Sequence, residues 1–227
     1  MMAKPAPSAI PFPNARLLVF AKAPVAGQVK TRMMPYLDPQ SCAALQRWLT
    51  ERTLTTAVSA AMCRVELWCA PHCAHPFFRE CESRYGVALC AQWGATLGAR
   101  MSFALRRALE RADFAIIVGC DCPVISPAYL KRACALLVDG APVVVGPAED
   151  GGYVLIGLSR KTLISARDAA TTLFTNITWG TPAVMEQTRA RLRGVNWEWH
   201  ELEPLWDVDR PTDLARLKTQ QQEWVRG

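Results

Sequence analysis

The sequence has no long hydrophobic segment. Its apolar runs all fall well short of the roughly 20 residues that a membrane-spanning helix needs. Residues 1–14 are rich in proline and lack the apolar region of a secretory signal peptide. Lysine and arginine are scattered, with no run of five or more, despite a net charge of +6. We therefore expect a cytoplasmic protein that neither spans a membrane nor binds nucleic acid.

Histidine is also scarce, with three in 227 residues, and none belongs to a recognisable Ser/His/Asp or Cys/His arrangement. This disfavours a hydrolase with an activated nucleophile. The nine cysteines show no repeating framework, which indicates reduced thiols rather than disulfides. The cluster formed by Cys69, His72, Cys73, His75 and Cys81 lacks the two paired spacings of a structural zinc site.

What is present is a large apolar fraction, 51% hydrophobic against 20% charged, which is enough for a buried core. We expect a flexible segment over residues 1–14 and a single domain over residues 15–227. Apolar runs predict strands at residues 16–21, 65–70, 87–91, 114–119 and 142–145. Helical spacing and capping residues predict helices at residues 39–61, 76–85, 96–112 and 127–138. Alternation of this kind indicates an α/β fold with a mostly parallel sheet, whose ligands bind at the carboxyl ends of the strands.

A basic loop follows the first of these strands. Residues 21–32 contain Lys22, Lys30 and Arg32 together with one proline and one glycine. Cationic side chains and backbone N–H groups in such a loop suit phosphate groups. The loop lacks the GxxxxGK[ST] pattern, so it is not a P-loop, and an ordinary basic surface loop is the alternative interpretation.

An aspartate stands at the end of the most hydrophobic strand. Asp121 follows residues 114–119, and a carboxylate in that position can hold Mg²⁺ or Mn²⁺ while the ion bridges nucleotide phosphates. The alternative role is a helix cap or a turn. The flanking Cys120 and Cys122 are soft donors that suit such an ion poorly, so we interpret them as core thiols.

Two further acidic segments are candidates for the same site. Residues 146–153 carry Glu149 and Asp150 before two consecutive glycines, so they offer a base or a metal ligand with room for a closely bound molecule. A simple acidic hairpin is the alternative there. Asp207 and Asp209 lie ahead of a helical stretch and can cap it. A metal-binding role for them requires that one of them meets Asp121 in space.

These segments resemble the DUF2064 family, whose members are similar to nucleotide-diphospho-sugar glycosyltransferases of the GT-A fold. The matching stretches are FAKAPVAGQVKTRM at 20–33, LGARM at 97–101, VGCDCPVISPAYL at 118–130, GPAEDGGYVLIGL at 146–158, LFTNITWGTPAVMEQT at 173–188 and DVDRPTDL at 207–214. The resemblance implies a Rossmann-like GT-A sheet, with Asp121 as the metal-binding aspartate and Gly27, Lys30 and Arg32 near the phosphates. The family usually has an acidic residue in a GDLGxRM pattern, where this chain has Thr96.

The leading hypothesis is a transferase that depends on Mg²⁺ or Mn²⁺ and moves a glycosyl group from a nucleotide-sugar to an acceptor. The alternatives are a nucleotidyltransferase that uses a nucleoside triphosphate, and a degenerate nucleotide-binding module. Asp121 and Asp150 are the predicted catalytic residues, and Asp121, Asp207 and Asp209 the predicted metal ligands. The predicted nucleotide-binding residues are Lys22, Pro24, Gly27, Lys30, Thr31, Arg32 and Arg100. The predicted donor and acceptor pocket consists of Glu149, Gly151, Gly152, Tyr153 and Trp179.

Overall fold

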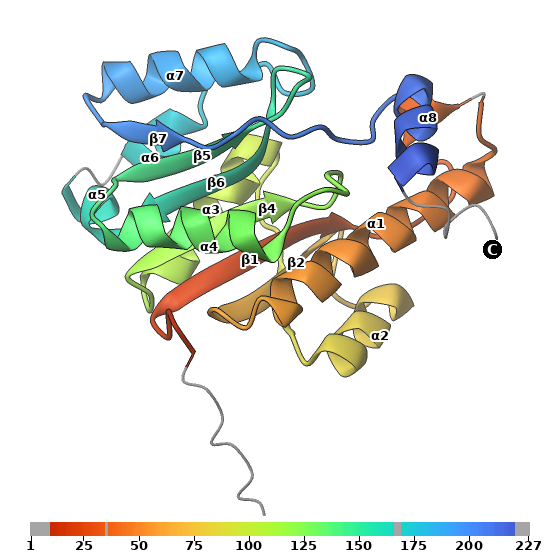
Figure 1. The fold of residues 1–227 in the computed structure, drawn as a ribbon, viewed down its shortest axis with the longest axis horizontal. Helices are drawn as coiled ribbons and strands as arrows, with labels where there is room; N and C mark the ends of the chain where they lie inside the picture. Colours follow the sequence, from red (N-terminus) through yellow and green to blue (C-terminus); the bar gives the residue numbers. More distant parts are fainter. Residues whose placement is uncertain (1–9, 35, 166–168, 221–227) are drawn as a thin grey trace, which may run out of the picture.

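A single twisted sheet forms the centre of the protein. The computed structural model describes residues 10–34, 36–165 and 169–220, and in this part of the chain seven strands pair in the order β3-β2-β1-β4-β6-β5-β7 (Figure 1). The strands are β1 (Ala15–Lys22), β2 (Arg64–Ala70), β3 (Ala88–Ala91), β4 (Phe114–Gly119), β5 (Val143–Pro147), β6 (Tyr153–Ser159) and β7 (Trp199–Glu201). All pairings are parallel except those of β6 with β4 and β5. The expected α/β fold with a mostly parallel sheet is confirmed.

Strand β6 was not predicted as a strand. It pairs antiparallel with β5, and a short loop that contains Asp150 and Gly151 joins the two, so the hairpin alternative for this segment describes the backbone correctly. Gly151 has φ +90°, a conformation that side chains rarely allow. The hairpin sends β6 back between β4 and β5 and leaves its turn at the edge where the parallel strands end.

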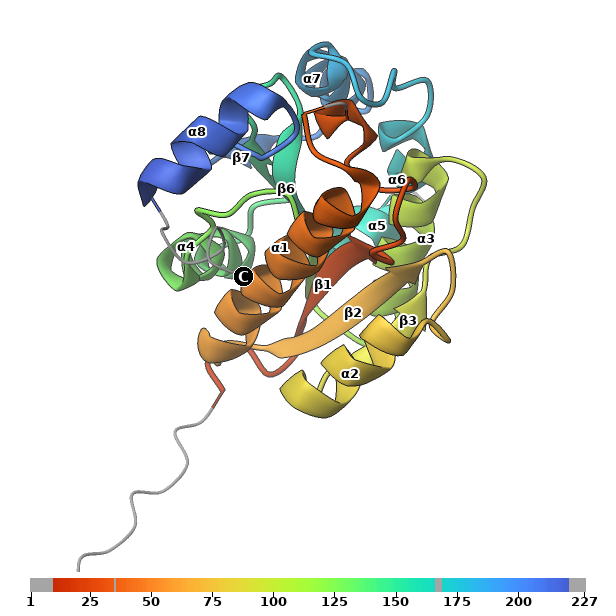
Figure 2. The same cartoon turned by 90° about the vertical axis from the view of Figure 1, so that its right-hand side faces the viewer.

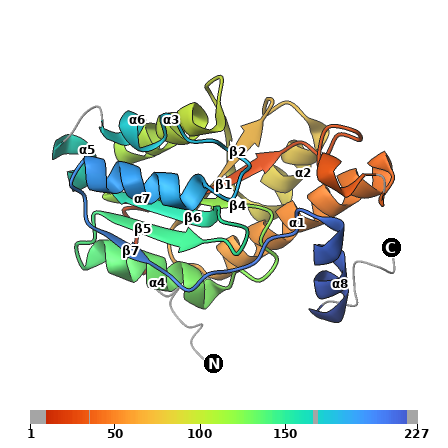
Figure 3. The same ribbon diagram turned by 90° about the horizontal axis from the view of Figure 1, so that it is seen from above.

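Helices cover both faces of the sheet (Figures 2 and 3). One face carries α1 (Pro39–Ser59), α2 (Pro76–Tyr85) and α4 (Pro127–Val138), and the other carries α3 (Leu97–Leu109), α5 (Arg160–Ser165), α6 (Ala169–Leu173) and α7 (Val184–Gly194). Asp38 caps α1 as expected, because its side chain accepts a hydrogen bond from Ser41 N at 2.8 Å and Pro39 occupies the first helical turn. Thr96 and Ser126 cap α3 and α4 in the same way.

The continuous apolar runs of β1 and β4 reflect burial on both faces of the sheet. Along β1, Leu17 and Val19 face the core beneath α1, α2 and α4, while Leu18 faces the core beneath α3 and α7. All three side chains are fully buried. Successive side chains of β1 face opposite sides of the sheet, but both sides are buried, so the sequence does not alternate between apolar and polar residues.

A third cluster of buried residues brings the end of the chain back to the sheet. Helix α8 (Pro211–Gln220) and the 3₁₀ turn η1 (Thr31–Met33) pack against the first turns of α1 through Met33, Leu45, Trp206 and Leu217. The segment before α8 runs beside the end of β5, where Leu205 N donates to Pro147 O at 3.0 Å, and then passes the end of β4, where Val208 N donates to Asp121 O at 2.9 Å. This packing carries residues 207–209 to the end of β4.

The predicted flexible segment falls mainly on residues 1–9, which lie outside the described residues. Within residues 10–14, Phe12 packs edge-on against Phe114 with ring centroids 6.0 Å apart, and its N–H donates to Met62 O. No helix in the described part of the chain is both long enough and apolar enough to cross a membrane.

Candidate functional site

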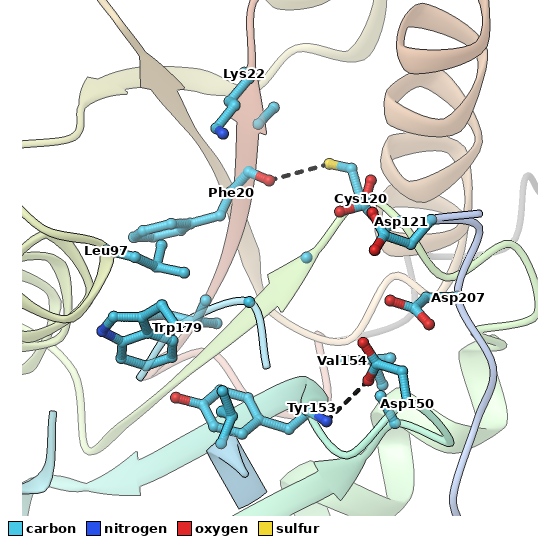
Figure 4. A pocket seen from close by; sticks show the side chains of 18 of the residues that line it. Phe20, Lys22, Leu97, Cys120, Asp121, Asp150, Tyr153, Val154, Trp179 and Asp207 are labelled. Atoms are coloured by element: carbon cyan, nitrogen blue, oxygen red, sulfur yellow. Dashed lines mark hydrogen bonds between the residues drawn. The ribbon is translucent and has the colours of Figure 1, made fainter. Parts of the chain in front are cut away.

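A cavity of about 480 Å³ opens at the carboxyl ends of β1 and β4. Parallel strands end at the same edge of a sheet, which is why the basic loop after β1 and Asp121 after β4 meet there. Figure 4 shows two unlike walls: Asp121, Asp150 and Asp207 on one side, and the apolar or aromatic side chains of Leu97, Trp179 and Tyr153 on the other. A ligand in this cavity therefore lies between a charged surface and a carbon-rich surface.

Most of the predicted site residues line this cavity. They are Lys22, Lys30, Thr31, Arg32, Asp121, Asp150, Gly152, Tyr153, Trp179, Asp207 and Asp209. The required meeting of Asp207 and Asp209 with Asp121 thus occurs, although their positions in the sequence are far apart. The functional roles given to these side chains remain predictions.

Five predicted residues do not line the cavity: Pro24, Gly27, Arg100, Glu149 and Gly151. Glu149 forms a bidentate ion pair with Arg216, at 2.6 and 3.1 Å, which lowers the pKa of the Glu149 carboxyl. Arg100 donates from Nε to Gly94 O at 2.9 Å, so it braces the loop before α3. Gly151 lets the hairpin turn approach Pro182, whose carbonyl oxygen would lie 2.2 Å from an added Cβ.

Lys30 is a buried cation in the acidic wall. Its backbone has φ +50°, an uncommon conformation for a residue with a side chain, and its side chain is 4% exposed. The ammonium forms an ion pair with Asp121 and donates to Val208 O at 2.7 Å. Lys30 therefore neutralises Asp121 and ties the basic loop to the segment before α8.

Arg32 makes a second link of the same kind. Its guanidinium pairs with Asp209 and donates to Gly180 O at 2.8 Å. The hydrogen bond to Asp209 is the main cause of a raised pKa for Arg32. Lys30 and Arg32, two of the three cations of the loop, thus each pair with a carboxylate of the cavity.

The carboxylate of Asp207 has less positive charge near it than those of Asp121 and Asp209. Burial is the main cause that raises the pKa of Asp207 to about 7, and the charges of Asp150, Asp121 and Asp209 raise it further, while Lys30 acts in the opposite direction. Asp150 itself is held in place because its Oδ1 accepts from Gly152 N at 2.8 Å. The cavity therefore holds an excess of negative charge around Asp207.

The carboxylates do not form a finished metal site. Across the described residues, no three His, Cys, Asp or Glu side chains are grouped as ligands of one ion. This holds for Cys69, Cys73 and their neighbours as well as for the aspartates of the cavity. The aspartates are nonetheless hard oxygen donors around a shared volume, which is the donor chemistry that Mg²⁺ and Mn²⁺ prefer.

The apolar wall contains residues that sequence reasoning missed. Phe20, Leu97 and Met101 line the cavity, although their positions in a strand and a helix indicate core packing. Tyr153 packs edge-on against Trp179, with centroids 6.1 Å apart and planes at 82°. The Tyr153 hydroxyl points away from the aspartates in Figure 4, so the tyrosine offers carbon rather than oxygen to a ligand. The signal that the sequence offered was the position of Leu97 and Met101 in the LGARM motif that matches the family.

Gln92, also missed, has a fixed orientation. Its Nε2 donates to Trp68 O at 2.8 Å and to Ala21 O at 3.3 Å, which leaves its Oε1 as an acceptor at the cavity. It follows directly after β3, another strand that ends at this edge. Its polarity at a strand end was the signal that sequence reasoning did not use.

Comparison with known proteins identifies the family. A model described as an uncharacterized protein conserved in bacteria (DUF2064) matches residues 53–181, more than half of the 227 residues. The chain belongs to the DUF2064 family. A search of curated proteins gives no significant match for this DUF2064 protein.

Solved structures agree with this fold. One is a protein of Desulfovibrio desulfuricans G20 whose name assigns it provisionally to the nucleotide-diphospho-sugar transferases; it is 26% identical with a TM-score of 0.81, over 93% of this chain and 89% of that chain. The 4-diphosphocytidyl-2C-methyl-D-erythritol synthase of Anaerococcus prevotii DSM 20548 is 8% identical with a TM-score of 0.63, over 93% and 99%. The Rv0371c protein of Mycobacterium tuberculosis H37Rv, solved in complex with manganese, is 19% identical with a TM-score of 0.56, over 92% and 100%. The last two likenesses concern the fold alone.

Proposed function

We propose that this DUF2064 protein is a metal-dependent transferase that moves a glycosyl group from a nucleotide-diphospho-sugar to an acceptor. The observation that carries the proposal is the charge of the cavity. The cations that line it are Lys22, Lys30 and Arg32, and the carboxylates are Asp121, Asp150, Asp207 and Asp209. The carboxylates outnumber the cations by one, so an anionic donor needs a divalent cation beside it.

The same charge balance favours a diphosphate over a triphosphate. A nucleotide-sugar carries two negative charges, so that with one divalent cation the filled cavity stays within about one charge of neutrality. A nucleoside triphosphate carries about four negative charges and leaves about three uncompensated. The carbon-rich wall of Leu97, Trp179 and Tyr153 suits the C–H faces of a sugar ring. Family membership and the transferase from D. desulfuricans support the class of nucleotide-using transferases.

The oxygen donors of the cavity fit a divalent cation, and Asp121 and Asp207 are the residues that would hold it. The raised pKa of Asp207 supports this assignment, because a carboxylate surrounded by other carboxylates is stabilised by a nearby positive charge. When bound, a divalent cation neutralises diphosphate oxygens and so stabilises the leaving group. Lys30 and Arg32 already stand beside Asp121 and Asp209, so they add positive charge next to the same oxygens.

Asp150 is the residue that we assign to the acceptor. The oxygen of an acceptor hydroxyl forms a bond to the anomeric carbon, and the bond from that carbon to the diphosphate breaks with both electrons left on the diphosphate. The hydroxyl proton passes to the Asp150 carboxylate, which the turn at Gly152 holds at the cavity.

Nucleotidyl transfer is the second candidate. It is favoured by the presence of Asp207 and Asp209 in the same cavity as Asp121, and by the likeness in fold to the 4-diphosphocytidyl-2C-methyl-D-erythritol synthase. In that reaction an acceptor phosphate attacks a triphosphate and pyrophosphate leaves. Release of a nucleoside diphosphate from a nucleotide-sugar distinguishes glycosyl transfer from it.

The decisive experiment compares Asp121→Asn with Asp113→Asn. The two aspartates flank β4 at its opposite ends, so Asp113→Asn is a matched control far from the cavity. The amide of Asp121→Asn still offers an oxygen to Lys30, which protects the fold. We measure diphosphate release from a panel of nucleotide-sugars and pyrophosphate release from triphosphates, each with Mn²⁺. Loss of at least about a hundredfold in diphosphate release for Asp121→Asn alone supports the proposal.

Equal diphosphate release by both variants would refute the role of Asp121. Pyrophosphate release with no diphosphate release would replace glycosyl transfer by nucleotidyl transfer. Nucleotide binding without either product would favour a degenerate module, which the Thr96 substitution in the family motif anticipates.

A further inference from the structure

A second cavity of about 740 Å³ lies along α3, outside the site described above. Its walls come from α3 and from the segment 171–179, which includes part of α6. Trp179 lines both this groove and the first cavity, so the two hollows share a wall. Figure 3 shows α3 and α6 side by side on the same face of the sheet. We call this second cavity the α3–α6 groove.

One face of α3 carries the polar groups of the groove. Gly98, Ser102 and Arg106 are four residues apart, so they lie above one another on the helix. At Gly98 an added Cβ would lie 2.4 Å from Phe174 O and 3.1 Å from Trp179 Cζ2, so the absence of a side chain lets this segment close against the helix. Arg106 lies two helical turns further on, about 12 Å along the axis.

Two polar groups of the groove have no partner among the described residues. Ser102 is a buried residue with 6% of its surface exposed, and it lines the groove. Its hydroxyl makes no hydrogen bond in the described part of the chain. A buried hydroxyl without a partner is costly and rare in a finished structure. The exposed Arg106 likewise forms no ion pair within the described ranges, whereas its neighbour Arg107 pairs with Glu110 at 2.7 Å. The buried Ser102 hydroxyl therefore indicates a ligand that supplies a hydrogen-bonding oxygen, and the Arg106 guanidinium is exposed where it can bind an anionic part of that ligand.

The remaining lining defines the rest of that ligand. Phe103, Phe174 and Trp179 contribute aromatic surface, and the cationic charge of Arg106 and Arg107 exceeds the single charge of Glu110. An anion with an apolar or aromatic body matches this combination. The rim hydroxyls of Thr171 and Thr175 add polar contacts along the opposite wall.

We infer that the α3–α6 groove is the acceptor subsite, and that the acceptor is an elongated molecule with a phosphate or carboxylate that binds Arg106 and an apolar body that packs on Phe174 and Trp179. The role of the bound molecule as the acceptor rests on the proposed function. The existence of a binding site rests on the groove alone. The anionic group lies about 12 Å from the Trp179 end, where the donor cavity adjoins. Ser102 donates to an oxygen of the bound molecule midway along this path.

The test measures binding of phenyl phosphate by isothermal titration calorimetry, with benzyl alcohol as the neutral probe. Arg106→Gln is compared with Arg111→Gln, an exposed arginine just beyond the same helix that does not line the groove. We expect phenyl phosphate to bind more tightly than benzyl alcohol. We also expect Arg106→Gln to weaken phenyl phosphate about tenfold, the effect of one charge-assisted hydrogen bond, while Arg111→Gln leaves affinity unchanged.

Ser102→Ala supplies an independent readout. Removal of an unpartnered buried hydroxyl raises the melting temperature of the free protein, whereas the same change weakens phenyl phosphate if the hydroxyl serves the ligand. A merely structural serine would not produce these opposite effects. No binding to the wild type, or equal affinity of Arg106→Gln and the wild type, would overturn the inference. Loss of affinity in Lys22→Gln but not in Arg106→Gln would place the probe in the donor cavity and also overturn it.

These outcomes are separate from those of the proposed function. Phenyl phosphate binding that depends on Arg106 establishes the groove even if no nucleotide-sugar is turned over, in which case the role as acceptor subsite falls. Turnover of a nucleotide-sugar together with phenyl phosphate binding that does not depend on Arg106 would support glycosyl transfer and would rule out the groove as a binding site.

Discussion

Replacement of Asp207 by asparagine should stabilise the ligand-free protein at pH 8. Burial and three neighbouring carboxylates raise the pKa of Asp207 to about 7, from an ordinary value of 3.8. An acid whose pKa is raised on folding binds a proton more tightly in the native state. Its contribution to stability is therefore complete below about pH 4 and is lost as the pH rises through 7. Asparagine cannot ionise, so the variant avoids this loss.

The magnitude follows from the two pKa values. The interval between 3.8 and about 7 corresponds to about 4 kcal/mol at 1.36 kcal/mol per pH unit. This is an upper bound, because Asp207 is only half-buried and solvent screens part of the repulsion. We expect a gain of about 1–2 kcal/mol at pH 8 and less than half of that at pH 5, where the native carboxyl is still protonated.

The measurement is urea unfolding of the wild type, Asp207→Asn and Asp113→Asn at pH 5 and pH 8. Changes in other carboxylates affect all three proteins and cancel in the differences. Asp113 lies at the opposite end of β4 and is exposed, so Asp113→Asn reports the effect of removing a surface charge. A stability gain of Asp207→Asn that is equal at both pH values, or equal to that of the control, would show that ionisation of Asp207 does not destabilise the native state.

Mn²⁺ should reverse the order of the two proteins. A ligand that binds only the native state stabilises it by about 2.7 kcal/mol at a hundredfold excess over its dissociation constant. If Asp207 holds the ion, the wild type gains this stabilisation and Asp207→Asn gains much less. An equal shift of the melting temperature in both proteins would remove Asp207 from the predicted metal ligands.

Two further changes test the packing around the site. Gly98→Ala should lower the free energy of unfolding by about 1–3 kcal/mol, because its Cβ would lie 2.4 Å from Phe174 O. In the control Gly194→Ala the new Cβ meets no heavy atom within 4 Å, so this change should raise the free energy of unfolding by about 0.4–1 kcal/mol. A higher melting temperature for Gly98→Ala than for Gly194→Ala would contradict this. Iodoacetamide at pH 8 should label the half-exposed Cys73 before Cys120, because burial raises the pKa of the Cys120 thiol to about 12. Mass spectrometry of the labelled peptides measures the order of labelling, and equal labelling rates would contradict this prediction.

Much of the fold could be predicted from local patterns. The helices at 76–85 and 127–138 have the predicted bounds, and the strands at 16–21 and 114–119 differ from β1 and β4 by at most one residue at an end. Each depends on information carried by neighbours in the chain, namely apolar runs, prolines at helix starts and capping side chains. Strand β6 escaped prediction because the apolar residues after Gly152 were assigned to a motif rather than to an element.

The candidate site could likewise be predicted in part from local patterns. Local sequence patterns were enough to predict which charged residues stand at strand ends, because strand, loop and helix follow one another along the chain and parallel strands must end at one edge. The pairing of these charges could be known only from the folded chain: Lys30 pairs with Asp121 across 91 residues, and Arg32 with Asp209 across 177. Coulombic energy and desolvation depend on distance and burial in space, neither of which is present in the order of residues. For the same reason Asp207, an ordinary aspartate in the sequence, acquires a raised pKa only when folding buries it and places other carboxylates around it.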